Sequence, residues 1–193
     1  MRLCFATNNK HKLEEVAFAI KNKISILSLS DIGCFEELPE TRDTLEGNSL
    51  QKAEYIFEHF QIPCFADDSG LEVEALHNAP GVYSARYAGD HKNSQDNIDL
   101  LLKNLTGISN RRAQFRTIIT LIGFDKIYTF EGTVKGKITH QRKGTGGLGY
   151  DPVFIPEGYD RSFGEMSLEE KNTLSHRAIA VEKLVTFLMA YQR

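Results

Sequence analysis

Hydrophobic and polar residues recur along this chain with two different periods, which predicts a mixture of helices and strands. The apolar residues Leu13, Val16, Ala17 and Ile20 have the i, i+3, i+4, i+7 spacing of a helix that covers a core. The run before them, residues 2–6, is short and apolar and predicts a buried strand. The chain is therefore expected to begin with a strand, a polar turn and an amphipathic helix.

Helical spacing returns in three later segments. Residues 44–60 place apolar side chains on one stripe, residues 93–105 have a similar pattern, and a final helix is expected to begin near Ser175. Ser167 and Glu170 have the spacing of a capping box, which predicts a short helix just before the final one.

Strand patterns lie between these helices. Residues 24–29 are one candidate, Pro63 opens a brief apolar strand, "PCFADDSG", that ends in acids, and "GLEVEAL" has the alternation of a half-exposed strand. Residues 112–124 and 126–139 are rich in β-branched and aromatic residues around an Asp125-Lys126 turn, which predicts a long hairpin. Because both kinds of element are interleaved without a linker-like segment, we expect a single mixed α/β domain over residues 1–193.

The composition limits the possible functions without choosing one. The 193 residues carry a net charge of −3, which argues against a nucleic-acid-binding module. The three cysteines are widely spaced and have no metal-binding pattern, which favours a reducing, cytoplasmic location. The N-terminus has too few apolar residues for a signal peptide or a membrane span, so no membrane partner is expected. An anionic ligand would have to be bound by a few local charges.

The acidic stretch "FADDSGL" is the first candidate for catalysis. Asp67, Asp68 and Ser69 come at the predicted end of a strand, where α/β proteins commonly place ligand-binding residues. Adjacent strand residues point to opposite faces, so only one of the two acids is expected to face a given site. A carboxylate there could bind Mg²⁺ or accept a proton from water, or it could simply cap a turn. Ser69 could instead be a nucleophile with His176 as its base, although the Gly-x-Ser-x-Gly pattern is missing.

Two other segments could bind an anion. In "TNNKHK" the backbone amides, Lys10 and Lys12 are expected at a helix N-terminus, where anions are favoured. Further along, Glu40 precedes a helix on which Asn48 and Lys52 share one face at i, i+4. Each segment could equally be an ordinary charged helix start.

His176 and Arg177 raise a different question, because cations in the first turn of a helix oppose the helix dipole. Their position requires an anion or another acceptor nearby, which either a ligand or a neighbouring acid could supply.

The glycine-rich stretch "KGTGGLGYDPVF" could be taken for a loop that wraps phosphates. It lacks the Gly-Lys-Ser/Thr ending of a P-loop, and it precedes a Pro-bounded strand rather than a helix. We therefore interpret it as something other than a P-loop.

Five motifs, taken in this order, resemble the inosine triphosphate pyrophosphatase family, also described as noncanonical purine nucleoside triphosphate pyrophosphatases. They are Ala-Thr-x-Asn-x-x-Lys from Ala6 to Lys12, "ADDSGLEVEAL", "PGVYSARYAG", "GTGGLGYDPVF" and "SHRA", and together they cover nearly the whole chain. The resemblance implies an elongated α/β fold with a mixed sheet and two lobes around a central nucleotide cleft. It also implies Mg²⁺-dependent hydrolysis of ITP, dITP and XTP to the monophosphate and pyrophosphate, which cleanses the nucleotide pool, in a homodimer.

The resemblance implies a role for each matching residue. Asp68 would be the catalytic carboxylate and a metal ligand, with Glu40 as a second acid at the metal. The triphosphate would be held by Thr7, Asn8, Asn9, Lys10, His11, Lys12, Lys52 and Ser69. The purine would lie against Leu148, Gly149, Tyr150 and Asp151, with Asp151 accepting from the base or orienting Arg177, and would be read by Lys171, His176 and Arg177.

The chemistry of such a substrate is compatible with these roles. A triphosphate carries about four negative charges, so a protein of net charge −3 needs a metal and a few placed lysines to bind it. Hypoxanthine and xanthine have a carbonyl at position 6 where adenine has an amino group, and Arg177 and protonated His176 only donate hydrogen bonds. Adenine would leave donors facing donors.

Leu148 departs from the family pattern, because the family most often has an aromatic residue there. Stacking on a ring contributes about 1 to 3 kcal/mol per base. The i, i+2 spacing of Leu148 and Tyr150 would put both side chains on one side of an extended chain, flanking the purine. We expect Leu148→Phe to lower the KM for ITP.

Two other functions fit the same residues. A non-catalytic nucleotide sensor would keep the binding residues without the reaction, and release of pyrophosphate from ITP would exclude it. A related pyrophosphatase could act on modified pyrimidine or standard nucleotides, which a panel of substrates would reveal.

Overall fold

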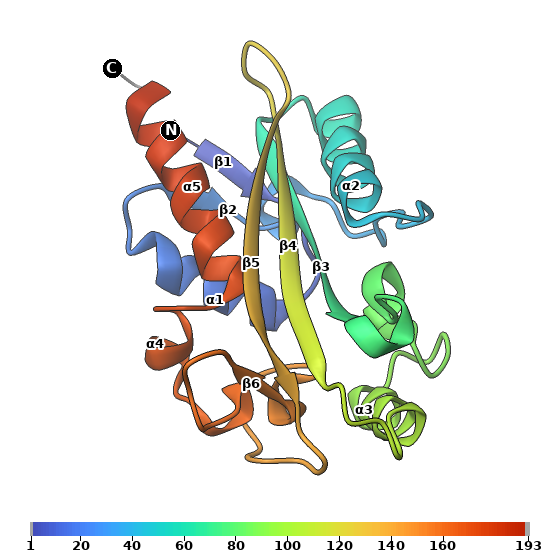
Figure 1. The fold of residues 1–193 in the computed structure, drawn as a ribbon. Coiled ribbons are helices and arrows are strands. Elements are labelled where there is room, and N and C mark those ends of the chain that lie inside the picture. The colour runs from blue at the N-terminus through green and yellow to red at the C-terminus, as the bar shows by residue number, and fades with distance from the viewer. Residues whose placement is uncertain (1, 192–193) are drawn as a thin grey trace. The chain divides into compact units, whose positions relative to one another are not determined.

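The computed structural model describes residues 2–191 and contains a six-stranded sheet with helices packed against it (Figure 1). The strands are β1 (Arg2–Phe5), β2 (Ser25–Leu27), β3 (Cys64–Val73), β4 (Arg112–Ile122), β5 (Tyr128–Ile138) and β6 (Phe154–Pro156), in the order β2-β1-β3-β4-β5-β6. β1 pairs in parallel with β2 and β3, whereas β5 and β6 are antiparallel. The predicted α/β class with a mixed sheet is confirmed, and so are the adjacent strands β4 and β5 of the predicted hairpin.

The helices are α1 (Lys10–Ile20), α2 (Leu45–Phe60), α3 (Ser94–Asn104), α4 (Leu168–Lys171) and α5 (His176–Tyr191). The helices predicted from apolar spacing are all present. The side chains of Asn9, Thr44 and Asn93 cap α1, α2 and α3 by accepting hydrogen bonds from backbone amides of the first turn. Among residues 2–191, no helix combines the length and the apolar character needed to cross a membrane.

The chain divides into two compact units. Within the described residues, unit 1 comprises residues 2–68, 117–132 and 176–191, and unit 2 comprises residues 69–116 and 133–175. Strands β3, β4 and β5 each contribute residues to both units. Each unit has its own buried side chains.

The core of unit 1 has two halves, because successive strand residues point to opposite faces of the sheet. Phe5 and Phe65 stack with their ring centroids 4.6 Å apart and belong to the half that contains α1 and α5. Ala6, which directly follows β1, and Ala66 of β3 belong to the half that contains α2. Unit 1 is therefore a layered arrangement in which helices cover both faces of its strands (Figure 1).

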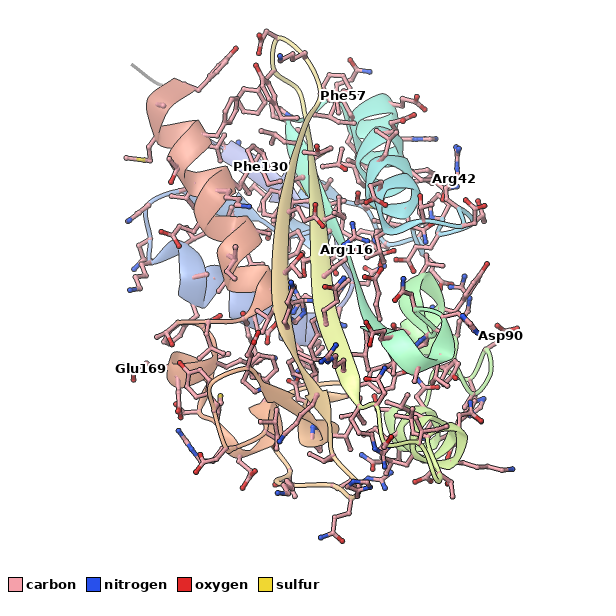
Figure 2. The ribbon with its side chains drawn as sticks, viewed as in Figure 1. Arg42, Phe57, Asp90, Arg116, Phe130 and Glu169 are labelled. Atoms are coloured by element: carbon pink, nitrogen blue, oxygen red, sulfur yellow. The ribbon has the colours of Figure 1, made fainter. Side chains whose placement is uncertain are left out.

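Aromatic residues at the outer end of β5 extend the first half of this core. Figure 2 shows Phe130 of β5 beside α5, where its ring lies 5.6 Å from that of Phe187. Tyr128 contacts the same Phe187 ring, with centroids 4.2 Å apart. These contacts pack the C-terminal half of α5 against β5.

The core of unit 2 is built around three aromatic rings. Phe154 lies 4.6 Å from Phe115 and 5.4 Å from Phe163, measured between centroids. On β4, Arg116 (Figure 2) donates to Glu72 of β3 at 3.1 Å. Unit 2 thus combines an aromatic core with polar links between neighbouring strands.

The predicted end of the acidic strand is wrong. β3 begins at Cys64 and does not stop at the acids but continues to Val73, so most of "PCFADDSG" and the first residues of "GLEVEAL" form one strand of 10 residues. Asp67 and Asp68 lie in its middle and are buried. Buried acids need partners, and the partners of Asp67 come from α1 and α5, far away in the sequence.

The predicted cap of α4 is present in a simpler form. Ser167 accepts a hydrogen bond from the backbone of Glu170, but the Glu170 side chain forms an ion pair with Arg161. The reciprocal capping box lies five residues earlier, at Ser162 and Glu165, where it begins a short 3₁₀ segment.

Candidate active site

A buried network of ion pairs links three elements of unit 1. Asp67 of β3 accepts from Lys12 Nζ of α1 at 3.2 Å and from Arg177 Nε of α5 at 3.1 Å. Arg177 also donates through Nη1 to Glu15 of α1. The side chains of Asp67, Glu15 and Arg177 are each less than a twentieth exposed. Such charges are tolerated only because each has a partner.

The network explains how Arg177 occupies the first turn of a helix. Of the two sources of an anion considered for Arg177, a ligand or a neighbouring acid, the structure shows the acids, since Asp67 and Glu15 both accept from its guanidinium. Burial alone would raise the pKa of Asp67, but Lys12, Arg177 and Lys52 outweigh it and hold that pKa well below its usual value. Asp67 is therefore a fixed anion that orders the cations around it.

Lys52 of α2 forms a second group of contacts. Its Nζ donates to Glu40 Oε1 and to the backbone oxygen of Asp67, both at 2.7 Å. Burial would lower the pKa of Lys52, but Glu40, Asp67 and Asp68 raise it above its usual value. Lys52 therefore remains a cation although it is buried.

Asp68 has the opposite electrostatic environment from Asp67. Burial raises its pKa to about 6, Lys52 and Lys12 oppose that shift, and Glu40 adds to it. As predicted, the two neighbours face different sides of the strand, since Asp67 contacts α1 and α5 whereas Asp68 follows Ala66 on the side of α2. A carboxyl group poised near pH 6 can exchange a proton with water.

At the start of α1, Lys12 points inward and is half-buried, whereas the residues just before it are exposed. Thr7 is buried and its Oγ1 accepts from the backbone of Asn9 at 3.1 Å, while Asn9 Oδ1 caps the helix. Lys12 reaches Asp67, and burial is the main cause of a lowered Lys12 pKa. The exposed residues of the predicted phosphate segment are Asn8, Asn9, Lys10 and His11.

The glycine-rich loop of unit 2 holds a second buried ion pair. Asp151 Oδ2 accepts from Lys171 Nζ at 2.6 Å and from the backbone amide of Leu148 at 2.9 Å. At Gly147, φ is 73° and an added Cβ would collide with the Asp151 carboxylate. The glycine thus permits the close approach that positions Asp151.

The predicted extended chain through Leu148 and Tyr150 is wrong. The Asp151 amide donates back to the Leu148 carbonyl at 3.2 Å and Gly149 has a φ of 56°, so these residues form a turn. Tyr150 is buried, and its hydroxyl donates to the Ser84 carbonyl at 2.6 Å. Spacing along a strand therefore gives no support for Leu148 and Tyr150 flanking the purine, and their contact with the base stays a prediction.

The predicted site residues fall into two sets. Unit 1 contains Thr7, Asn8, Asn9, Lys10, His11, Lys12, Glu40, Lys52, Asp68, His176 and Arg177, and unit 2 contains Ser69, Leu148, Gly149, Tyr150, Asp151 and Lys171. Glu15 was missed. The available signal was its place three residues after Lys12, beside Val16 on the buried face of α1, together with the unexplained cation at Arg177.

Comparison of the sequence with known proteins shows the family to which the chain belongs. Residues 3–187 match the family model described as the Ham1 family. The chain belongs to the Ham1 family. A relative from Flavobacterium johnsoniae, named dITP/XTP pyrophosphatase, is 53% identical over 190 residues, which are 98% of this chain and 99% of the relative. A protein of the same name from Porphyromonas gingivalis is 52% identical and covers 97% of each chain.

Solved structures lead to the same family. The structure of the Staphylococcus aureus Ham1 protein superimposes with a TM-score of 0.90 at 36% identity, covering 99% of this chain and 100% of that one. A Ham1 protein from Coxiella burnetii gives a TM-score of 0.90 at 32% identity. The resemblance recognised from the five motifs is confirmed.

Proposed function

We propose that this Ham1-family chain hydrolyses noncanonical purine nucleoside triphosphates, namely ITP, dITP and XTP, to the monophosphate and pyrophosphate. Relatives at 52–53% identity over almost the whole chain are named dITP/XTP pyrophosphatases, which supports a hydrolase of this class. The observation that carries the proposal is Asp68, a buried acid whose pKa is raised to about 6 beside Lys12 and Lys52.

The triphosphate is proposed to bind at the start of α1. Lys12, in the first turn of α1, offers positive charge, and the N-terminal end of the helix favours anions. Lys52 adds a second cation from α2, held in place by Glu40 and the Asp67 carbonyl. These fixed positive charges would stabilise the negative charge that develops on the departing pyrophosphate.

The residues of unit 1 fit a Mg²⁺ ion that is bound mainly through the substrate. Among residues 2–191, no three His, Cys, Asp or Glu side chains form a group suited to a metal. Mg²⁺ commonly uses only one or two carboxylates together with phosphates and water. Asp68 and Glu40 offer carboxylate oxygens, which are the ligands that Mg²⁺ prefers. Glu40 raises the pKa of Asp68 by charge repulsion, and a cation bound between the two carboxylates would relieve that repulsion. When bound, Mg²⁺ would neutralise phosphate charge.

Asp68 is proposed to accept the proton of the water that attacks the α-phosphorus. A base with a pKa of about 6 is ionised at neutral pH yet still holds a proton well enough to assist the transfer. Asp67 holds Lys12 and Arg177 in position through its two ion pairs. The products are then the nucleoside monophosphate and pyrophosphate.

Base recognition is proposed for Lys171, His176 and Arg177. Lysine and arginine only donate hydrogen bonds, and protonated histidine does the same, so the 6-carbonyl of hypoxanthine or xanthine is a better partner than the 6-amino group of adenine. Asp151 holds Lys171 at 2.6 Å and so fixes the direction of its ammonium group.

We also propose that the protein is a homodimer in the cytoplasm. The three cysteines are free and buried, which suits a reducing compartment. Sedimentation equilibrium tests the dimer, with an expected mass of two 21.8 kDa chains. A single-chain mass over a wide concentration range would contradict it.

Hydrolysis of ITP in ¹⁸O-labelled water, with ATP, dATP, dGTP and a modified pyrimidine triphosphate as further substrates, tests both the substrate class and the position of attack. We expect ITP, dITP and XTP to react much faster than ATP, with ¹⁸O in the monophosphate and none in pyrophosphate. Label in pyrophosphate would contradict attack at the α-phosphorus. Tight binding of ITP without any product would identify a nucleotide sensor instead.

A further inference from the structure

A basic pocket of about 940 Å³ lies within unit 2, at the end of β5. Two backbone hydrogen bonds define this end of the strand, because the Ile138 amide donates to Arg111 and the Thr139 amide donates to Val153, both at 2.9 Å. β6 completes the wall by pairing Phe154 with Ile138. The pocket is therefore formed by regular structure in a part of the chain to which the proposed function assigns no role.

The side chains around this pocket carry one sign of charge. Arg111, Arg112, Lys137 and Lys143 line it, and none of the eleven described lining residues is Asp or Glu. The protein as a whole has a net charge of −3. Four cations around one concavity in an otherwise acidic chain create a local positive potential that attracts anions.

The pocket also contains hydrogen-bond donors, which belong to Arg111. Arg111 Nη2 donates to His140 Nδ1 at 2.5 Å, so Nδ1 carries the lone pair and the proton of the neutral ring is on Nε2. The Nε and Nη1 atoms of Arg111 are buried and have no hydrogen-bond partner among the described residues. A buried donor without an acceptor is costly, and an anionic oxygen would remove that cost.

We propose that this pocket binds a small phosphate-bearing anion. Its volume lies within the range of sites for small molecules, about 300 to 1,000 Å³, and exceeds what a single phosphate would fill. Arginine binds phosphate oxygens through paired N–H groups, and Lys137 and Lys143 supply point charges at the rim. Inorganic pyrophosphate and a nucleoside diphosphate share this chemistry. The pocket shares no residue with the candidate active site, so the proposal does not depend on the proposed function.

Two histidines allow the pocket to be followed separately from the active site. His140 lines the pocket and His176 lies in unit 1, so their ring C–H signals in a ¹H–¹³C NMR spectrum of the whole protein report on different sites. Substitutions to Gln at each position assign the signals. Pyrophosphate and ADP are titrated in parallel, with sodium sulfate at equal ionic strength as the control for screening.

The expected result is a saturable shift of the His140 signal with pyrophosphate or ADP that sulfate does not reproduce. The double variant Lys137→Met, Lys143→Met alters only exposed side chains and should weaken this binding about tenfold, without changing the response of His176. Lys103→Met, an exposed lysine of α3 outside the pocket, is the matched control and should bind as the wild type does. Arg111→Met should abolish the shift.

The comparison between the two anions identifies the source of the phosphate. Tighter binding of ADP assigns the pocket to nucleotides, whereas tighter binding of pyrophosphate assigns it to inorganic anions. Absence of a saturable shift at His140 overturns the proposal. An equal effect of the double variant and of Lys103→Met also overturns it, because only general screening would then be involved.

Discussion

Asp67 and Asp68 are adjacent in the chain but their pKa values are shifted in opposite directions. Asp67 meets Lys12 and Arg177 and has a lowered pKa, whereas burial raises the pKa of Asp68 to about 6. The difference follows from strand geometry, which sends neighbouring side chains to opposite faces. One acid can therefore order cations while the other remains available to exchange a proton.

This contrast predicts opposite effects of removing the two charges. The folded state favours the protonated form of Asp68, so its stabilising contribution is complete below pH 3.8 and is lost as the pH rises through about 6. At pH 7.5 Asp68→Asn should increase the free energy of unfolding by about 1 to 3 kcal/mol. The increase should shrink toward pH 4.5. Urea unfolding in EDTA at several pH values measures it.

Asp67→Asn is the matched control for that experiment. The lowered pKa of Asp67 means that its contribution is present above pH 3.8 and is lost as the pH falls below it. Removing this charge at pH 7.5 leaves Arg177 and Lys12 short of an anion and should decrease the free energy of unfolding by about 3 to 5 kcal/mol. The same sign for both variants at pH 7.5 would contradict the assignment of the two environments.

Glu15 should matter for stability although no sequence motif includes it. Glu15→Ala leaves a buried arginine with one acid fewer and should decrease the free energy of unfolding by about 2 to 4 kcal/mol. The exposed neighbour Glu14 gives the control, since Glu14→Ala should change it by less than about 0.5 kcal/mol. Thermal or urea unfolding of both variants measures this difference. A similarly small decrease in both would show that the ion pair between Glu15 and Arg177 does not stabilise the fold.

Among the elements, local patterns predicted the helices and the hairpin well. Apolar spacing placed α1, α2, α3 and α5, and β-branched runs placed β4 and β5. The predicted end of β3 was wrong because acidic residues in a sequence indicate the end of a buried strand, unless their partners on other elements are known. The turn at Leu148 was missed for a similar reason, since Asp151 and Lys171 hold it through contacts distant in sequence.

The candidate site was predicted from motifs more than from geometry. Residue identities at Lys12, Lys52, Asp68 and Arg177 matched a family pattern, and the structure places all four in unit 1. The pairing of Arg177 with Glu15 could not be read from the sequence, because it joins the start of α5 to the middle of α1.

The packing of α5 on β5 depends on Gly132. A Cβ at this position would collide with the carbonyl oxygen of His176 and would lie 2.8 Å from the backbone nitrogen of Ala180. Gly132→Ala should therefore displace the first turn of α5, decrease the free energy of unfolding by about 1 to 3 kcal/mol and lower kcat/KM. Thr129→Ala, at an exposed position of the same strand, should leave kcat/KM unchanged. Wild-type stability and kcat/KM in Gly132→Ala would contradict this packing role.

For the whole molecule, charge is organised locally rather than globally. The chain has a net charge of −3, yet it buries lysines and an arginine beside acids in unit 1 and gathers four cations around a pocket in unit 2. Local placement permits binding of highly charged phosphates without the broad basic surface that would attract nucleic acids. Family membership and this pattern of charge both favour a small phosphorylated substrate.

The most direct test is the steady-state release of pyrophosphate from ITP and ATP by the wild type and by Asp68→Asn, with nucleotide affinity measured by calorimetry. The wild type is expected to favour ITP over ATP by about a hundredfold in kcat/KM. Asp68→Asn should reduce kcat by about a thousandfold while ITP still binds. A near-normal kcat in Asp68→Asn, or equal hydrolysis of ITP and ATP by the wild type, would contradict the account.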